Sequence, residues 1–198
     1  MREPLADRQL FLGRVKIVQR KPTPEEIRAA VGKTVPDIIA PDLQVLFCGI
    51  NPSLYSAAVG HHFARPGNRF WRSLHIAGFT ERLLAPFEDK DLLQFGYGLT
   101  NIVDRATARA DELDPEELVA GHQHLAAKVQ HYRPRFLAIL GISAYRTAFN
   151  RPKAVMGQQD ESLHSAIIWV LPNPSGLNAH YQLNDLKQVY RELLVAAK

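Results

Sequence analysis

The chain has 198 residues, of which 46% are hydrophobic and 22% are charged, and it carries a net charge of +4 with a pI near 9.3. This is the composition of a globular chain with a full hydrophobic core, and the positive charge permits a polyanionic partner without requiring one. No apolar run reaches the length of a membrane span, the N-terminus lacks a signal-peptide core, and a single cysteine, Cys48, excludes an intramolecular disulfide. We expect a cytoplasmic protein in which Cys48 is a small buried side chain.

The first elements of the chain can be predicted from capping residues. Residues 1–20 show no firm periodicity, and we interpret them as an extension that precedes a single domain at residues 21–198. In the segment that follows, Thr23 is placed to cap a helix, Glu26 completes a capping box, and Gly32 is a stop signal.

Strands and helices then alternate along the chain. Residues 44–50 (QVLFCGI) form a continuous apolar run, which is typical of a strand covered on both faces. In chain order we predict helices at 68–78 and 90–96, a strand at 98–104, a helix at 114–132, a strand at 135–141, a short helix at 142–149, a strand at 166–172 and a last helix at 183–197. This alternation predicts an α/β fold, a three-layer sandwich whose short, mainly parallel central sheet is flanked by helices.

The tripeptide Asn-Pro-Ser occurs twice, each time directly after a predicted strand. One copy is Asn51–Ser53 and the other is Asn173–Ser175. Most Asn-Pro pairs start turns, but ligands of such sheets gather beyond the carboxyl ends of the strands. We therefore expect the two copies to share a site.

Acidic residues are missing around both copies. Residues 43–80 contain no Asp or Glu but include Arg65, Arg69 and Arg72, and residues 162–184 contain no acid, Lys or Arg. The first segment could approach phosphates and the second could touch bases or sugars, although a solvated loop that lacks acids is the alternative.

Standard catalytic motifs are absent, so the candidate functional residues have to be sought among side chains outside such motifs. Asn51 offers hydrogen-bond donors and an acceptor but does not titrate, which suits holding a water molecule rather than acting as a base. Phe63 could stack on a ligand or pack under its own loop, and Leu177 is either a core residue or a projecting wedge. The pair His61-His62 has no neighbouring carboxylate or cysteine in the sequence, so we expect no metal site.

Three motifs together resemble one family. GINPS at 49–53, FARPGNRFW at 63–71 and NPSGL at 173–177 are similar to motifs of the mismatch-specific uracil/thymine-DNA glycosylases of the uracil-DNA glycosylase superfamily, and residues 21–41 resemble the lead-in of the thymine branch. The resemblance implies a monomeric, monofunctional base-excision-repair hydrolase with a uracil-DNA glycosylase-like fold. Such an enzyme binds double-stranded DNA, flips out uracil, chiefly from G:U mismatches, and hydrolyses its N-glycosidic bond to leave an abasic site. Thymine and damaged pyrimidines are further candidate substrates.

The resemblance also implies roles for individual residues. Asn51 positions the attacking water, Phe63 stacks on the flipped base, and Leu177 fills the vacated space in the duplex. The implied base-binding residues are Ile50, Ser53, Phe63 and Asn173, and the implied DNA-binding residues are Ser56, Ser175, Gly176, Leu177 and Asn178. No metal or organic cofactor is implied, and the protein would be associated with the nucleoid when it is on DNA.

The sequence departs from the bacterial pattern at two places. Ser53 replaces a glycine, and Asn178-Ala179 replaces Ser-Arg, which leaves the opposite-base preference open. Asp104, at the end of a predicted strand, is a second and weaker catalytic candidate, because a cap of the following turn is the favoured role for an Asp at this place.

Two other functions remain possible from the sequence. One is a non-catalytic duplex-DNA-binding module of the same fold. The other is a nucleotide-hydrolysing α/β enzyme, which predicts a phosphate-cradling glycine loop that the sequence lacks. The order of preference among U:G, T:G, U:A, single-stranded and lesion substrates is open, as are the role of residues 1–20 and any carboxylate assistance to Asn51.

Overall fold

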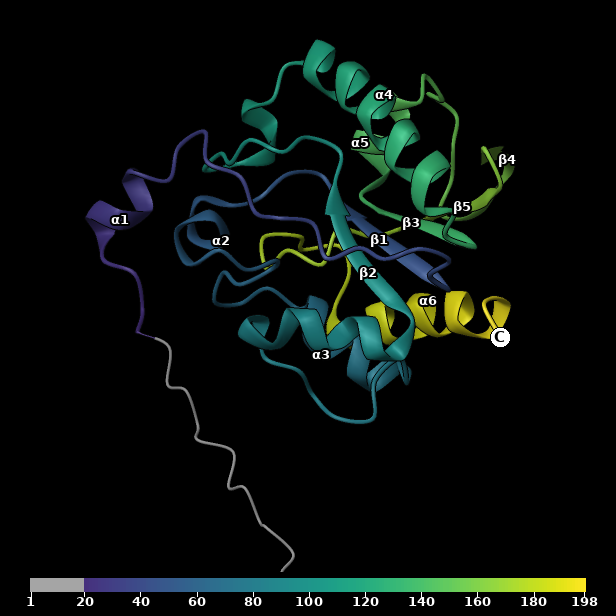
Figure 1. Cartoon of the computed structure of the whole chain (residues 1–198), viewed down its shortest axis with the longest axis horizontal. Helices are drawn as coiled ribbons and strands as arrows, with labels where there is room; N and C mark the ends of the chain where they lie inside the picture. Colours follow the sequence, from purple (N-terminus) through teal and green to yellow (C-terminus); the bar gives the residue numbers. More distant parts are fainter. Residues whose placement is uncertain (1–19) are drawn as a thin grey trace, which may run out of the picture.

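The computed structural model describes residues 20–198, so the predicted extension lies outside it except for Arg20. Its centre is a five-stranded sheet in the order β2-β1-β3-β5-β4 (Figure 1). The strands are β1 (Val45–Gly49), β2 (Tyr97–Asn101), β3 (Phe136–Leu140), β4 (Gly157–Leu163) and β5 (Ala166–Leu171). Four of them run parallel, and β4 pairs antiparallel with β5 at one edge.

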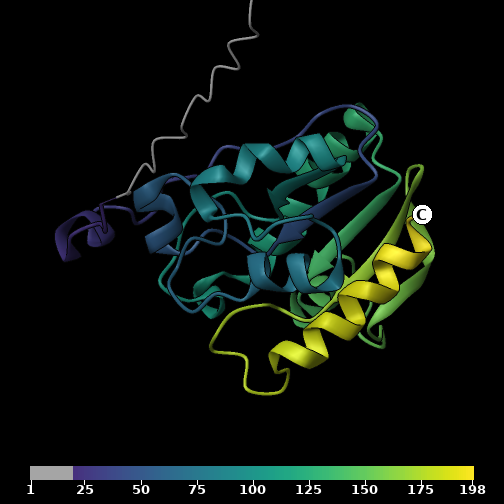
Figure 2. The same cartoon turned by 90° about the horizontal axis from the view of Figure 1, so that it is seen from below.

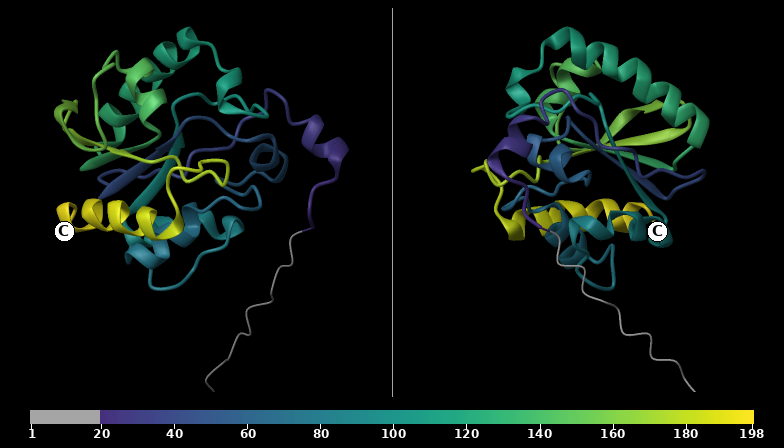
Figure 3. Two further views of the ribbon diagram at one scale, coloured as in Figure 1. Left: turned by 180° about the vertical axis from the view of Figure 1, so that it is seen from behind. Right: turned by 60° about the vertical axis from the view of Figure 1, so that its left-hand side comes forward.

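Helices cover both faces of the sheet and complete three layers. On one face lie α3 (Phe70–Ala77), the 3-10 helix η1 (Pro86–Phe95) and α6 (Leu183–Ala196); on the other lie α4 (Pro115–Tyr132) and α5 (Ile142–Ala148) (Figures 1 and 3). The short elements are α1 (Pro24–Arg28), α2 (Leu54–Val59) and the 3-10 turn η2 (Ala110–Glu112). The α/β sandwich predicted from the sequence is thus confirmed. Within residues 20–198, none of the helices combines the length and the apolar character that a membrane crossing needs.

The apolar run of β1 is continuous because both of its faces are buried. Successive side chains of a strand point to opposite faces: Phe47 packs into the core under α3 and α6, whereas Leu46 and Cys48 pack into the core under α4 and α5. All five residues of β1 are buried, and Cys48 is fully buried as expected. The buried side chains of Val45, Leu46 and Phe47 each contribute about 1.5–3 kcal/mol, which favours the central place of β1 in the sheet.

Three elements were missed, namely β4, α2 and the three-residue turn η2, and the second strand was predicted too long. β4 (GQQDESL) is a polar edge strand with alternating half-buried residues, so it lacks the apolar run that marked the other strands. α2 is only six residues long; Ser53 caps its start and Gly60, with φ 76°, ends it. β2 ends at Asn101, so Asp104 lies three residues beyond the strand rather than at its end. The capping box of Thr23 and Glu26 is confirmed.

Candidate active site

A pocket lies beyond the carboxyl ends of the strands, at the point where the strand order reverses. The chain leaves β1 toward β2 on one side and returns to β3 on the other, which opens a crevice between their loops. The pocket is lined by residues that follow β1, by the ends of β2 and β3 and by the loop after β5, among them Gly49, Ile50, Asn51, Ser53, Ser56, Phe63, Asn101, Thr107, Leu140, Asn173, Ser175 and Leu177. The two Asn-Pro-Ser copies therefore meet in one site.

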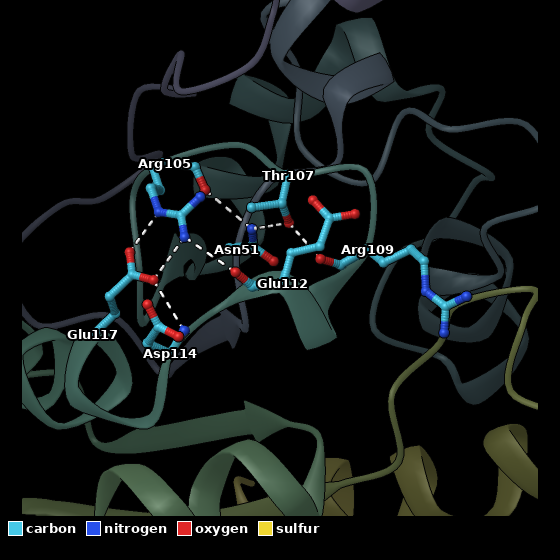
Figure 4. Close-up of polar contacts among 7 residues, drawn as sticks. All are labelled: Asn51, Arg105, Thr107, Arg109, Glu112, Asp114 and Glu117. Carbon is cyan, nitrogen blue, oxygen red and sulfur yellow. Dashed lines mark hydrogen bonds and ion pairs between the residues drawn. The ribbon is translucent and has the colours of Figure 1, made fainter.

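Asn51 has a fixed side chain with one free atom. Its Nδ2 donates to the carbonyl oxygen of Arg105 at 3.0 Å and to Oγ1 of Thr107 at 2.7 Å (Figure 4). Oγ1 of Thr107 in turn donates to the carbonyl of Arg109 at 2.6 Å. Both amide hydrogens are therefore used, while Oδ1 forms no hydrogen bond with any residue in the described range of 20–198. This arrangement presents an acceptor at the pocket.

The partners of Asn51 belong to a segment of backbone that is itself held on two sides. We call residues 105–109 the strap. Thr107 donates its backbone N–H to the carbonyl of Pro52 at 3.2 Å and accepts from Leu54 at 3.1 Å. On the far side, Ala106 donates to the carbonyl of Lys33 at 2.8 Å. The strap therefore behaves as a short extra strand that sets the orientation of Asn51.

The floor of the pocket needs a glycine at position 49. A Cβ added there would lie 2.5 Å from Oδ1 of Asn101 and 3.3 Å from Cζ of Phe63. Asn101 is only 4% exposed, yet its amide forms no hydrogen bond with other residues of the described part. The amide is not among the fully buried polar groups that lack a partner, so its atoms reach the pocket, where a ligand or water can satisfy them. Asn101 was missed from the sequence, where the only signal was a polar residue inside a predicted strand.

Phe63 packs against the core and also borders the pocket. Its ring stacks on Phe70, with 4.1 Å between the ring centroids, and the ring also borders the pocket. The backbone of Phe63 has a φ of +53°, a left-handed conformation that is uncommon for an aromatic residue. Strained backbone of this kind is typical of functional sites, and here it brings the ring over Gly49.

The residues at the start of α2 have structural tasks as well as places in the pocket. Oγ of Ser53 accepts the backbone N–H of Ser56 at 3.2 Å and so caps the helix. Oγ of Ser56 accepts the backbone N–H of Ala64 at 3.1 Å. His62, also in the lining, donates from Nε2 to the carbonyl of Pro36, and burial lowers its pKa, which keeps it neutral at neutral pH. The serine at position 53 therefore serves as a helix cap.

The loop that contains the second Asn-Pro-Ser copy is held in place by hydrogen bonds from Arg69. The Arg69 guanidinium donates to the carbonyls of Pro174, Ser175, Asn178 and Tyr181. Figure 2 shows the loop as the segment that leads from the sheet into α6. Within the loop, Oδ1 of Asn173 accepts the backbone N–H of Ser175 at 2.9 Å, as in an Asx turn. Arg69, which the acid-free segment suggested for phosphate contact, is thus engaged in holding this loop.

Leu177 and Gly176 lie at the outer rim. Leu177 is 70% exposed, so it is not a core residue. A Cβ on Gly176 would lie 2.6 Å from the carbonyl oxygen of Gly67, so only glycine allows the two loops to approach so closely. Gly176 and Leu177 also line a neighbouring hollow with Arg65. Asn178 lies outside the pocket lining and donates from Nδ2 to the carbonyl of Asn173, which supports the loop from within.

Asp104 is the one candidate catalytic residue that lies away from the pocket lining. Its carboxylate is exposed and pairs with Lys128 at 3.4 Å, and Lys128 also pairs with Asp37 at 2.8 Å. The fold does bring a carboxylate to the histidine pair, because Oδ2 of the buried Asp89 lies 3.1 Å from Nδ1 of His61. Among residues 20–198, no group of three or more His, Cys, Asp or Glu side chains is arranged to hold a metal ion.

The fold and the pocket define an α/β protein with a polar-lined pocket beyond the carboxyl ends of its strands, the usual place for a ligand in such sheets. Residues 36–194 match the model of the family described as the Uracil DNA glycosylase superfamily, and the chain belongs to this superfamily. A similar solved structure is the solution structure of a candidate uracil DNA glycosylase from Methanosarcina acetivorans. The two chains are 20% identical with a TM-score of 0.54, and the match covers 83% of this chain and 99% of the other. At this identity the likeness concerns the fold.

Proposed function

We propose that the protein is a monofunctional uracil-DNA glycosylase that removes uracil, chiefly from G:U mismatches in duplex DNA, by hydrolysing its N-glycosidic bond. The main observation behind the proposal is the side-chain amide of Asn51. Both of its N–H groups donate to the strap, which leaves Oδ1 as a free acceptor beside the pocket. A free acceptor there suits the orientation of a water molecule. Membership of the superfamily supports base excision as the reaction.

The pocket suits a flat pyrimidine ring that has been flipped out of the duplex. Phe63 offers a ring surface for stacking. The unpaired amide of Asn101 has an acceptor for the N3–H of uracil and a donor for its O4. Burial makes this match selective, since a base that leaves the amide unpaired loses affinity.

The reaction needs a positioned water rather than a strong base. Oδ1 of Asn51 accepts a hydrogen from the water and aims the water oxygen at C1′ of the deoxyribose. The bond from C1′ to N1 breaks, and the electron pair leaves with uracil as a stabilised anion. The new bond joins the water oxygen to C1′, one proton is released to solvent, and the uracil anion takes up a proton after departure. No lysine lines the pocket among the described residues, which favours hydrolysis over a covalent Schiff base.

The residues at the rim of the pocket are suited to contact the DNA that flanks the flipped base. Leu177 projects where a side chain could fill the space left by the flipped base, and Gly176 presents backbone beside it. Arg65 borders both the pocket and the adjoining hollow, so its guanidinium is available to a flanking phosphate. The approach of phosphates is helped by the absence of acids between residues 43 and 80.

The direct test is base release from duplexes that carry one uracil or thymine opposite guanine or adenine. We expect abasic sites in the U:G duplex, fewer in U:A, and none with Asn51→Ala on the same time scale. Binding of the U:G duplex without base release would point to a non-catalytic DNA-binding module. Hydrolysis of a free deoxyuridine nucleotide without activity on DNA would point to a nucleotide hydrolase. Either result would contradict the proposal.

A further inference from the structure

Arg105 connects Asn51 to the start of helix α4. Its Nε and Nη2 donate to the two carboxylate oxygens of Glu117, with Nη2 at 2.6 Å from Oε2, and Nη2 also donates to the carbonyl of Glu112 at 3.2 Å (Figure 4). Paired donors on one carboxylate form the strongest and most directional kind of ion pair. Arg105 is therefore held in one orientation by its side chain.

Glu117 is fixed in its turn by the helix that it belongs to. It is the third residue of α4, and its Oε2 accepts the backbone N–H of Asp114 at 3.0 Å in a capping box. The Arg105 guanidinium, followed by the Asp114 amide, lowers the pKa of Glu117 to about 2. The carboxylate is therefore charged throughout the pH range in which a DNA glycosylase would be assayed.

The other end of the connection is the main chain of Arg105. Its carbonyl oxygen is one of the two acceptors of Asn51 Nδ2, at 3.0 Å, and the second acceptor, Thr107, lies two residues further along the strap. A shift of the strap would turn the amide and move Oδ1 away from the pocket. The side chain of Arg105 thus anchors the segment that aims Asn51.

We propose that Arg105 and Glu117 are positioning residues for the Asn51-directed water, and this inference rests on the proposed glycosylase function. An exposed ion pair contributes little to stability on average, so we expect its effect on the rate rather than on folding. A misplacement of a catalytic group by about 1 Å can cost roughly 10²-fold in rate.

The chain offers a matched control pair. Arg82 donates to Glu88 at 2.9 Å and to Asp91 at 2.8 Å, and its side chain is 39% exposed, the same as that of Arg105. Within residues 20–198, Arg82 itself forms no hydrogen bond with the strap and does not line the pocket. A comparison of the two arginines therefore separates the effect of losing the contact to the strap from the general effect of losing a surface ion pair.

The experiment measures single-turnover uracil release from a U:G duplex by wild type, Arg105→Gln, Glu117→Gln and Arg82→Gln. We expect Arg105→Gln and Glu117→Gln to be about 10- to 100-fold slower, with unchanged DNA affinity, and Arg82→Gln to stay within about twofold. Thermal unfolding identifies a variant that fails to fold, and Glu117→Gln provides the second route because glutamine keeps an acceptor for the helix cap.

A double-mutant cycle tests whether the effect passes through Asn51. In an Asn51→Ala background, Arg105→Gln should slow the residual reaction by less than about twofold, because there is no amide left to aim. The NMR signals of the Asn51 side-chain amide can be assigned by their absence in Asn51→Ala. Their chemical shifts should change in Arg105→Gln and not in Arg82→Gln. Wild-type rates in Arg105→Gln, or an equal loss in both backgrounds, would overturn the inference. If wild type releases no uracil, the proposed function fails, and unchanged Asn51 amide signals would separately refute the positioning role.

Discussion

The two Asn-Pro-Ser segments have the same residues and follow strands of the same sheet, but they are held in different ways. The side-chain N–H groups of Asn51 donate to two residues of the strap, which lie 54 and 56 positions further along the chain. Asn173 uses its side-chain oxygen inside its own turn, where it accepts from Ser175. The amide of Asn51 is therefore aimed by tertiary structure, whereas that of Asn173 shapes a loop. The difference predicts chemistry at the first copy and duplex contact at the second.

The anchors of the two segments differ as well. The first is paired through backbone hydrogen bonds with the strap, which spreads its support over several groups. The second depends on one cation, Arg69, whose guanidinium binds four carbonyls of the loop. At the end of this second segment Leu177 is 70% exposed. The inner segment is thus held at several points and the outer one ends in an exposed leucine, an arrangement that suits the proposed base excision from a duplex.

The largest expected effect is that of Asn51→Ala. We expect single-turnover uracil release to fall by roughly 10²–10⁴-fold, the scale of a positioned catalytic group, while DNA binding survives. Asn173→Ala should cost at least tenfold less, because its oxygen serves the turn and not the water. Equal losses in the two variants, measured on the same U:G duplex, would remove the distinction between the two copies.

Leu177→Ala should impair duplex processing without affecting the fold. We expect a rate loss of about tenfold or more on paired uracil, with a melting temperature near that of wild type. Leu186, a fully buried leucine of α6, is the control, since Leu186→Ala should lose roughly 2–5 kcal/mol of stability. A large drop in melting temperature for Leu177→Ala, together with normal duplex activity, would place Leu177 in a structural role.

Salt dependence distinguishes Arg65, which borders the pocket, from Arg72, which does not. Arg65→Gln should reduce the slope of log affinity against log salt by about 0.9, the value for one phosphate contact. Arg72 is exposed on α3 but does not line the pocket or the adjoining hollow, so Arg72→Gln should leave the slope nearly unchanged. Equal changes for both variants would indicate diffuse attraction rather than a contact at the rim.

The smallest effect is expected for Asp104→Asn. Asp104 pairs with Lys128 outside the pocket lining, so the rate should stay within about twofold of wild type. An acid limb in the pH profile of wild type that disappears in Asp104→Asn, with near-normal activity of Asn51→Ala, would transfer the assistance of water to Asp104.

Much of the fold could be predicted because its signals are local. The apolar run of β1, the capping box of α1 and the strand-ending Asn-Pro-Ser copies each depend on neighbouring residues. Edge strand β4 was missed because its residues are polar and only half buried, and α2 because six residues carry little periodicity.

The contacts that orient the site could not be predicted, because they join distant segments. Nothing near Asn51 in the sequence indicates that its amide will meet the strap, or that Asn101 will lie unpaired in the pocket floor. Arg69 looked like a phosphate contact because charge alone does not show that four carbonyls will surround it. The residue types of the site were therefore visible in the sequence, but their partners were not.

The central claim is that the first Asn-Pro-Ser copy performs the chemistry and the second handles the duplex. It is tested most directly by comparing uracil paired with guanine and uracil in an unpaired stretch flanked by duplex, with wild type, Asn51→Ala and Leu177→Ala. We expect Asn51→Ala to lose roughly 10²–10⁴-fold on both substrates, and Leu177→Ala to recover most of its activity when the uracil is already unpaired. A Leu177→Ala loss that is equal on both substrates, or an Asn51→Ala loss confined to the paired uracil, would contradict this division of work.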